Sequence, residues 1–182
     1  MRAFLAIELD DKTRQLLRDI QEKLKEAGVR GNYSLPDNLH LTVKFLSEIN
    51  EAQVKKVSAM MKNIASRHQL FVLGLEPLGK FKKGNKMVLW AGIRNSPPLM
   101  DLYNDVHSNL SPILPGLEDK NYSPHITLVR EAVYPALFTE LNQSIIHLNH
   151  TFHAEGLSLM ESTRKEGRLA YQRCVFEPFI SE

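Results

Sequence analysis

Two short segments of the sequence each place a histidine and a threonine two residues apart. The first is "NLHLTVKFL" (38–46), with His40 and Thr42, and the second is "SPHITLVR" (123–130), with His125 and Thr127. An imidazole can take up or release a proton near neutral pH, because its ordinary pKa is about 6.5. A threonine hydroxyl can donate a hydrogen bond to an oxygen that carries negative charge. The four side chains could therefore supply an acid, a base and two donors to one reaction.

Both segments alternate as β-strands do, so side chains two apart should share a face. Alternation places His40, Thr42 and Lys44 on one face of the first strand. The opposite, apolar face would then carry Leu39, Leu41, Val43 and Phe45. Because an unpaired imidazole or hydroxyl is costly to bury, we expect the polar face to line a groove.

A single motif of this kind could be a core histidine with a satisfied hydrogen bond, but the chain contains the motif twice among only 7 histidines. If the two strands meet, two imidazoles would lie on opposite sides of one cleft. This arrangement suits in-line displacement at phosphorus, where one ring removes a proton and the other protonates the leaving oxygen. Arg130 could hold a phosphate with its guanidinium. Strict alternation points Arg130 away from His125, so it reaches the cleft only if the strand twists or ends there.

The elements that must position these residues follow from periodicity and end signals. Helices are predicted over 10–28, 50–67, 96–110 and 134–148, with N-caps at Asp10 or Asp11, at Asn50, and at Asn95 or Ser96. Strands are predicted at 2–9, at both motifs, and as hairpins over 70–93 and 151–176. The hairpin turns "KFKKGNK" (80–86) and "TRKEGR" (163–168) are basic. If they flank the cleft, they would attract a nucleic-acid backbone.

The same order of elements recurs along the chain. The spacing between His40 and His125 equals the spacing between Ala6 and Ala91, which lie in similar predicted strands. We therefore expect one domain, residues 1–182, with an internal repeat of approximately 1–80 and 86–160 and a final strand at 168–177. The expected fold class is α+β, with two pseudo-symmetric lobes.

The composition is that of an ordinary globular protein, with 43% hydrophobic residues and a formal net charge of +2. Cys174 has no second cysteine to pair with, which favours a reducing compartment. The apolar stretch near the N-terminus is too short for a signal segment, and no run approaches the about 18 apolar residues of a membrane span. We expect a cytoplasmic protein without a membrane partner.

The paired motifs, together with "RAFLAIEL" (2–9) and "LWAGI" (89–93), resemble the two-histidine (2H) phosphoesterase superfamily. Within it, the chain resembles the RNA 2′,3′-cyclic phosphodiesterases, also known as RNA 2′-5′ ligases. The resemblance implies a bilobal α+β fold with antiparallel sheets lining a central cleft and helices outside. It also implies hydrolysis of a 2′,3′-cyclic phosphate at an RNA end to a 2′-phosphate. We expect no metal or other cofactor, and a monomeric protein.

By the same resemblance, His40 is the proton donor to the departing 3′ oxygen and His125 is the base that acts on water. The reverse assignment is chemically open. Thr42 and Thr127 would bind the phosphate with Arg130, and Tyr33 and Phe4 are candidates for contact with a base. The chain has Tyr33 where many relatives have tryptophan, and Ser47 where many have glycine. These two departures concern how the substrate is recognised and leave the predicted acid, base and hydroxyls unchanged.

Three alternatives to this function remain at this point. The substrate could be a small cyclic nucleotide or a cyclic phosphate on ADP-ribose. The protein could instead be a 2′-5′ RNA ligase, or a module that binds tRNA-like ends without turnover. A metal site at the two histidines would need further ligands, and no motif with metal-binding spacing supplies them.

Overall fold

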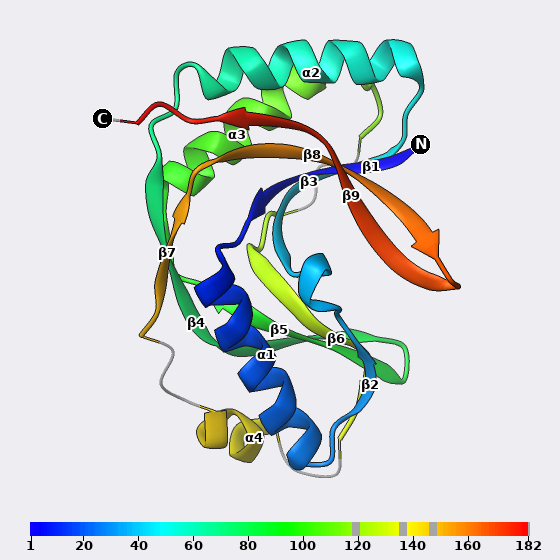
Figure 1. The fold of residues 1–182 in the computed structure, drawn as a ribbon, viewed down its shortest axis with the longest axis vertical. Helices are drawn as coiled ribbons and strands as arrows, with labels where there is room; N and C mark the ends of the chain where they lie inside the picture. Colours follow the sequence, from blue (N-terminus) through cyan, green and yellow to red (C-terminus); the bar gives the residue numbers. More distant parts are fainter. Residues whose placement is uncertain (118–120, 135–137, 146–148, 182) are drawn as a thin grey trace.

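Strands and helices alternate in the computed structural model, which describes residues 1–117, 121–134, 138–145 and 149–181 (Figure 1). The strands are β1 Arg2–Glu8, β2 Arg30–Tyr33, β3 His40–Glu48, β4 Phe71–Lys83, β5 Lys86–Ile93, β6 His125–Val133, β7 Thr151–Ala154, β8 Gly156–Lys165 and β9 Arg168–Pro178. The helices are α1 Asp11–Glu26, α2 Glu51–Ala65, α3 Pro97–Leu110 and α4 Phe138–Ile145, with a short 3₁₀ turn at Pro36–Asn38.

Helices α1, α2 and α3 begin where polar side chains satisfy their first backbone N–H groups. Asp10 Oδ1 accepts a hydrogen bond from the Thr13 amide at 2.7 Å, and Ser96 caps α3 in the same way. Asn50 and Gln53 form a reciprocal capping box at the start of α2. Each cap stabilises its helix by about 1 kcal/mol. The predicted caps at Asp10, Asn50 and Ser96 are confirmed.

One apolar stripe of each long helix is buried, as the periodicity predicted. In α3 the stripe consists of four fully buried residues, Leu99, Leu102, Val106 and Leu110. In α4 Leu141 is buried, while the predicted Leu137 lies outside the described residues. Buried residues from both sheets and from the helices form one continuous apolar cluster.

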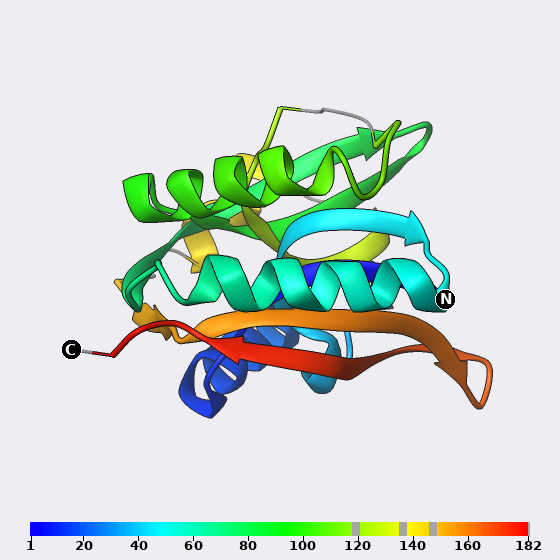
Figure 2. The ribbon, with the colours of Figure 1, turned by 90° about the horizontal axis from the view of Figure 1, so that it is seen from above.

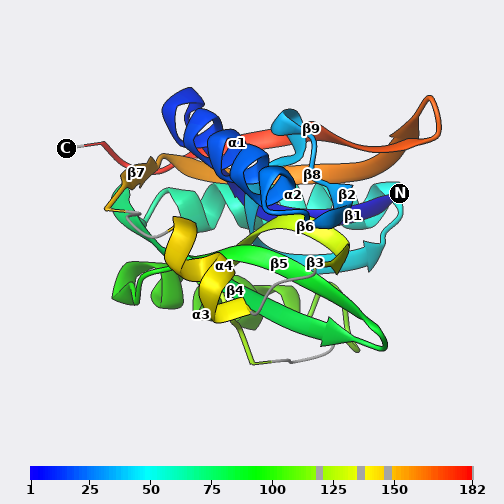
Figure 3. The ribbon, with the colours of Figure 1, turned by 90° about the horizontal axis from the view of Figure 1, so that it is seen from below.

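The strands form two antiparallel sheets. The four-stranded sheet has the order β3-β1-β8-β9, and the five-stranded sheet has the order β2-β6-β5-β4-β7. Helices α2 and α3 lie side by side and contact strands of the four-stranded sheet (Figure 2). Helices α1 and α4 lie over the five-stranded sheet (Figure 3). The expected α+β fold with antiparallel sheets and outer helices is confirmed.

Each sheet takes strands from both ends of the chain. β4 follows the first histidine strand but belongs to the five-stranded sheet, and β8 and β9 come last but pair beside β1. The division between the sheets therefore does not fall at the middle of the sequence. The internal repeat of about 1–80 and 86–160 stays a prediction.

Of the two predicted hairpins, one forms as predicted and the other is divided between the two sheets. β4 and β5 form one hairpin over nearly their whole length. The segment 151–176 instead breaks after β7, which pairs with β4, while β8 and β9 form the hairpin in the other sheet. The turns of the β4–β5 and β8–β9 hairpins project from the same side of the molecule (Figures 1 and 3).

The short strand β2 was not predicted. It is only four residues long and largely exposed, so it lacks the apolar alternation that would reveal it, and it exists because it pairs with β6. Within the described residues, no helix is long and apolar enough to cross a membrane.

Candidate active site

The structure brings the two histidine–threonine motifs together around one hollow. His40 and His125 are the first residues of β3 and β6, one from each sheet, and the two strands approach each other. The hollow has a volume of ≈ 220 Å³ and is lined by His40, Thr42, His125, Thr127 and Arg130, with Ser34, Asn38, Phe45, Phe81 and Val88. We call it the histidine hollow.

Both imidazoles are fixed by the same local hydrogen bond. Nδ1 of His40 lies 2.7 Å from the carbonyl oxygen of Asn38, and Nδ1 of His125 lies 2.7 Å from that of Ser123. A carbonyl can only accept, so Nδ1 carries the hydrogen in each ring. The other nitrogen, Nε2, is then left as the proton acceptor or donor for chemistry. Nε2 of His40 lies 2.9 Å from the Thr42 hydroxyl, within the hollow.

The surroundings of both rings oppose a positive charge. Burial lowers the pKa of His40 to about 4, an effect that the Asn38 carbonyl and Glu8 partly oppose and that the charge of Arg130 reinforces. Burial also lowers the pKa of His125, again with a contribution from Arg130. Both imidazoles are therefore neutral at pH 7 when the hollow holds no anion.

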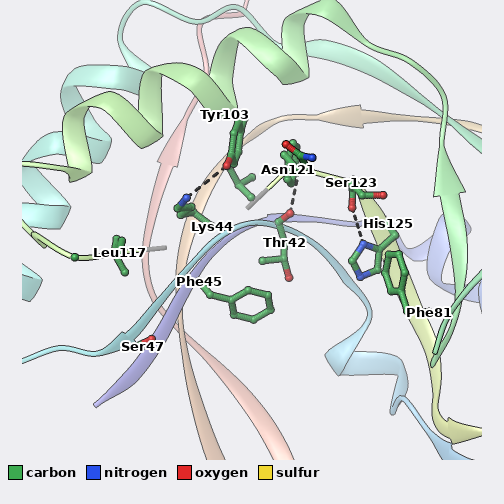
Figure 4. Close-up of a pocket in the computed structure, with 13 residues that line it drawn as sticks. Thr42, Lys44, Phe45, Ser47, Phe81, Tyr103, Leu117, Asn121, Ser123 and His125 are labelled. Atoms are coloured by element: carbon green, nitrogen blue, oxygen red, sulfur yellow. Dashed lines mark hydrogen bonds between the residues drawn. The ribbon is translucent and has the colours of Figure 1, made fainter. Parts of the chain in front are cut away.

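Aromatic rings hold each histidine in place. His40 packs against Phe4 and Tyr171, with ring centroids at 4.7 and 5.1 Å. His125 packs edge-on against Phe81 at 4.9 Å and against Trp90 at 5.6 Å, and these two rings also contact each other at 5.0 Å. Figure 4 shows the rings of His125 and Phe81 close together at the edge of the hollow that Phe45 enters.

The absence of a side chain at Gly79 in β4 makes room for Trp90, which packs against His125. A Cβ atom at Gly79 would come within 2.0 Å of the Trp90 ring, so the indole lies directly against the bare backbone at its cross-strand partner. Only glycine allows this approach without a steric clash.

A bulge in β6 turns Arg130 into the hollow. The β5–β6 pairing shifts register between Leu89 and Trp90, and the consecutive residues Leu128 and Val129 are both fully buried. The extra residue reverses the alternation, so Arg130 faces the same side as Thr127. The requirement stated for Arg130, that the strand must depart from strict alternation, is therefore met.

A second bulge changes the corresponding part of β3. Its pairing with β1 shifts between Leu5 and Ala6. The prediction that Phe45 faces the core is wrong, because Phe45 is 62% exposed and lines the histidine hollow. Lys44 is 7% exposed and does not line this hollow, although it lines an adjoining one with Thr42 and Phe45. Five residues after its histidine, each motif thus directs a different side chain inward, Phe45 in β3 and Arg130 in β6.

The two aromatic candidates for base contact lie apart from each other. Phe4 is 2% exposed and lies beneath His40, so a base could reach its ring only past that histidine. The Tyr33 hydroxyl donates to the Val29 carbonyl at 2.8 Å, and its side chain lines a neighbouring hollow that contains Arg130. Contact of either residue with a base stays a prediction.

Sequence reasoning did not identify several residues at the site. Asn38 orients His40 through its carbonyl, and its side chain bridges to β9 through Leu169 and Tyr171. Phe45 and Phe81 face the hollow. The position of Asn38 beside the motif was a signal that could have been used, but the orientation of Phe45 depends on the bulge and had no local signal.

Two larger hollows adjoin the histidine hollow. One, which we call the aromatic hollow, shares Thr42, Phe45, Phe81 and His125 with it and has a volume of ≈ 610 Å³ (Figure 4). The other, the arginine hollow, shares Ser34, Asn38 and Arg130 and has a volume of ≈ 510 Å³. The three together make a cleft between the sheets that is larger than a single phosphate needs.

Comparison with known proteins agrees with this architecture. A family model described as "LigT like Phosphoesterase" matches residues 7–90. The crystal structure of apo LigT from E. coli superposes with a TM-score of 0.77 at 26% identity, covering 98% of this chain and 96% of that one. The complex of the same protein with 3′-AMP has a TM-score of 0.75 at 25% identity. The fold and the site therefore define a phosphoesterase, a class of hydrolase.

Curated relatives indicate which family of phosphoesterases the chain resembles. An RNA 2′,3′-cyclic phosphodiesterase of Thermotoga maritima is 30% identical over 146 residues, which are 80% of this chain and 78% of the relative. One of Archaeoglobus fulgidus is 31% identical over 132 residues, 71% of this chain and 72% of the relative. The chain belongs to the LigT-like phosphoesterase family of the two-histidine superfamily. The predicted resemblance to this family is confirmed.

Proposed function

We propose that this protein opens the 2′,3′-cyclic phosphate at the end of an RNA, giving a 2′-phosphate and a free 3′ hydroxyl, by acid–base catalysis with two histidines and no metal. The observation that carries the proposal is the pair of imidazoles that line one hollow from opposite sheets, each with Nδ1 bound to a backbone carbonyl so that Nε2 is left for chemistry. The relatives named RNA 2′,3′-cyclic phosphodiesterase support the choice of substrate.

The phosphate would lie between the two imidazoles. Hydroxyls of Thr42 and Thr127 donate to its non-bridging oxygens, and the Arg130 guanidinium offsets its negative charge. These three groups line the same hollow as the histidines. Their donors act where charge increases in the transition state, which is the condition for lowering the barrier.

The reaction then needs one proton to be removed and one supplied. Nε2 of His125 accepts a proton from water as the water oxygen forms its bond to phosphorus. The bond from phosphorus to the 3′ oxygen breaks, and Nε2 of His40 gives its proton to that oxygen. His125 ends protonated and His40 neutral, so a proton exchange with solvent restores the starting state.

His40 must acquire its proton before it can act as the acid. Its pKa is about 4 in the free protein, partly because Arg130 is nearby. An anionic substrate that offsets the charge of Arg130 favours the imidazolium, so substrate binding raises the pKa of His40 toward its ordinary value. Substrate charge and proton supply are thereby linked.

The proposal is tested with an RNA oligomer that ends in a 2′,3′-cyclic phosphate, incubated with the protein in EDTA. We expect conversion to a 2′-phosphate, and a loss of at least about 100-fold in kcat/KM for both His40→Ala and His125→Ala. His153→Ala is a matched control, because His153 is exposed on β7 and lines none of the three hollows.

Two outcomes would contradict the proposal. One is a rate close to wild type in both histidine variants. The other is an RNA that binds but stays unchanged over long incubation, which would favour a module that holds RNA ends.

A further inference from the structure

The arginine hollow contains two arginines, Arg164 and Arg168, that the proposed hydrolysis does not use. Arg164 and Arg168 line it together with Arg130, and they come from the two ends of the β8–β9 turn. None of the described residues that line this hollow is an aspartate or a glutamate. Three guanidinium groups are therefore held around one concave surface.

These three arginines differ from several others in the protein in their lack of an ion-pair partner among the described residues. Arg14, Arg67 and Arg173 each form an ion pair with a carboxylate. Across the part of the chain that the structure describes, no ion pair is found for Arg130, Arg164 or Arg168.

The carboxylate next to Arg130 is already engaged by other groups. Lys86 Nζ lies 3.0 Å from Glu131, and the Asn32 amide donates to the same side chain at 3.2 Å. Of the three arginines, Arg164 also has a contact within the turn, where its Nη1 donates to the Gly167 carbonyl at 3.2 Å. Cations gathered without counter-ions repel one another, and a bound anion relieves that repulsion.

The position of the hollow indicates which anion it would take. It adjoins the histidine hollow and shares Ser34, Asn38 and Arg130 with it. Two neighbouring anion sites with one arginine between them match two successive phosphates of one nucleotide strand. The aromatic hollow lies on the opposite side, where the exposed rings of Phe45 and Phe81 suit a base (Figure 4).

We propose that the arginine hollow binds the 5′ phosphate of the terminal nucleotide, whose 2′,3′-cyclic phosphate occupies the histidine hollow. This inference rests on the proposed function and extends it to the class of substrate. The site then selects nucleotides joined to a strand, or carrying a free 5′ phosphate, over nucleoside cyclic phosphates that lack one. Arg164 and Arg168 act only in binding this phosphate.

The smallest probe compares adenosine 2′,3′-cyclic phosphate with and without a 5′ phosphate. We expect wild-type protein to favour the 5′-phosphorylated substrate by about tenfold in kcat/KM, with an advantage that shrinks as NaCl is raised. In the double variant Arg164→Gln/Arg168→Gln the ratio between the two substrates should fall close to one. Lys55→Gln/Lys56→Gln removes the same charge from the exposed side of α2 and should keep the wild-type ratio.

The outcomes separate this inference from the proposed function. If wild-type protein hydrolyses both substrates with equal efficiency, or if the arginine double variant keeps the wild-type ratio, the phosphate site is wrong and the hydrolysis stands. If the lysine double variant loses the ratio as fully as the arginine variant, the effect is one of net charge and the site is also wrong. If wild-type protein hydrolyses neither substrate nor the RNA oligomer, the proposed function itself fails.

Discussion

The two histidines have the same local hydrogen bond but different surroundings. His40 packs against Phe4 and Tyr171, which also contact each other, and burial, Arg130 and His125 all disfavour its charged form. His125 packs against Phe81 and Trp90, and Arg130 lowers its pKa as well. Neither ring is poised as an acid in the free protein, so the assignment of acid and base must be tested on the reaction itself.

A sulfur leaving group can identify the acid. When the 3′ bridging oxygen of the cyclic phosphate is replaced by sulfur, the leaving thiolate needs no proton, because a thiol is far more acidic than an alcohol. If His40 is the acid, His40→Ala should lose at least about 100-fold on the oxygen substrate and less than about tenfold on the sulfur substrate. The measurement is kcat/KM for both substrates.

The matched control in this experiment is His125→Ala, which should stay impaired on both substrates because the base is still needed. Rescue of His125→Ala instead of His40→Ala would reverse the two roles.

The lowered pKa of the buried His40 also leads to a prediction about the free energy of unfolding. Its pKa is about 4 in the folded protein and 6.5 in its ordinary state. Between these pH values the unfolded chain binds a proton at His40 that the folded protein does not bind. The free energy of unfolding therefore falls as the pH falls from 6.5 to 4. We expect the free energy of unfolding of the wild type to fall by about 3 kcal/mol more than that of His40→Asn between pH 7 and pH 4.

Urea unfolding of both proteins at several pH values measures this difference. Parallel curves for wild type and variant would show that folding does not suppress protonation of His40.

At the scale of elements, two bulges complete the site. A regular β3 would direct Lys44 toward the histidine hollow, and a regular β6 would direct Arg130 away from it. The shifted registers exchange these orientations, so that Phe45 and Arg130 both face the histidine hollow. The sequence predicted the strands correctly, but a bulge depends on pairing with β1 or β5 and leaves no local pattern.

Each of these strands also contains a residue with a left-handed backbone near its end. Ser47 in β3 has φ 60° and Glu131 in β6 has φ 54°. This conformation costs a non-glycine residue about 1–2 kcal/mol, and a glycine at position 47 would not carry this cost.

We therefore expect Ser47→Gly to change the free energy of unfolding by about 0 to 1 kcal/mol in the stabilising direction, since relief of strain exceeds the added entropy of the unfolded chain. Ser47→Val should destabilise the protein by about 1–3 kcal/mol, because a β-branched residue tolerates this backbone poorly. Urea titration checks both variants. A glycine variant less stable than the valine variant would contradict this explanation.

At the scale of the whole molecule, the cleft depends on the exchange of strands between the two ends of the chain. β4 joins the sheet of β5 and β6, and β8 joins the sheet of β1 and β3. One continuous apolar cluster connects both sheets. The two histidines are therefore held by a single core, and their separation does not depend on a flexible linker between two lobes.

The two basic hairpin turns come to lie on the same side of the molecule only in the whole fold. Both project from the same side of the molecule (Figure 1). The β8–β9 turn places Arg164 and Arg168 beside Arg130 of the other sheet. In the sequence these residues lie in separate segments, so the sequence indicated that the turn 163–168 is basic but not that it lies beside Arg130.

The sequence by itself predicted the candidate catalytic residues and determined most of the elements. His40, Thr42, His125 and Thr127 followed from residue types at a spacing of two, and the helices followed from caps and apolar stripes, because these signals are local. Only the tertiary structure decided that the four side chains share one hollow, that Phe45 replaces Lys44 there, that Arg130 turns inward and that two further arginines gather beside it. Strand pairing between distant segments sets these features, and a pairing energy is shared between two parts of the chain, so neither part encodes it alone.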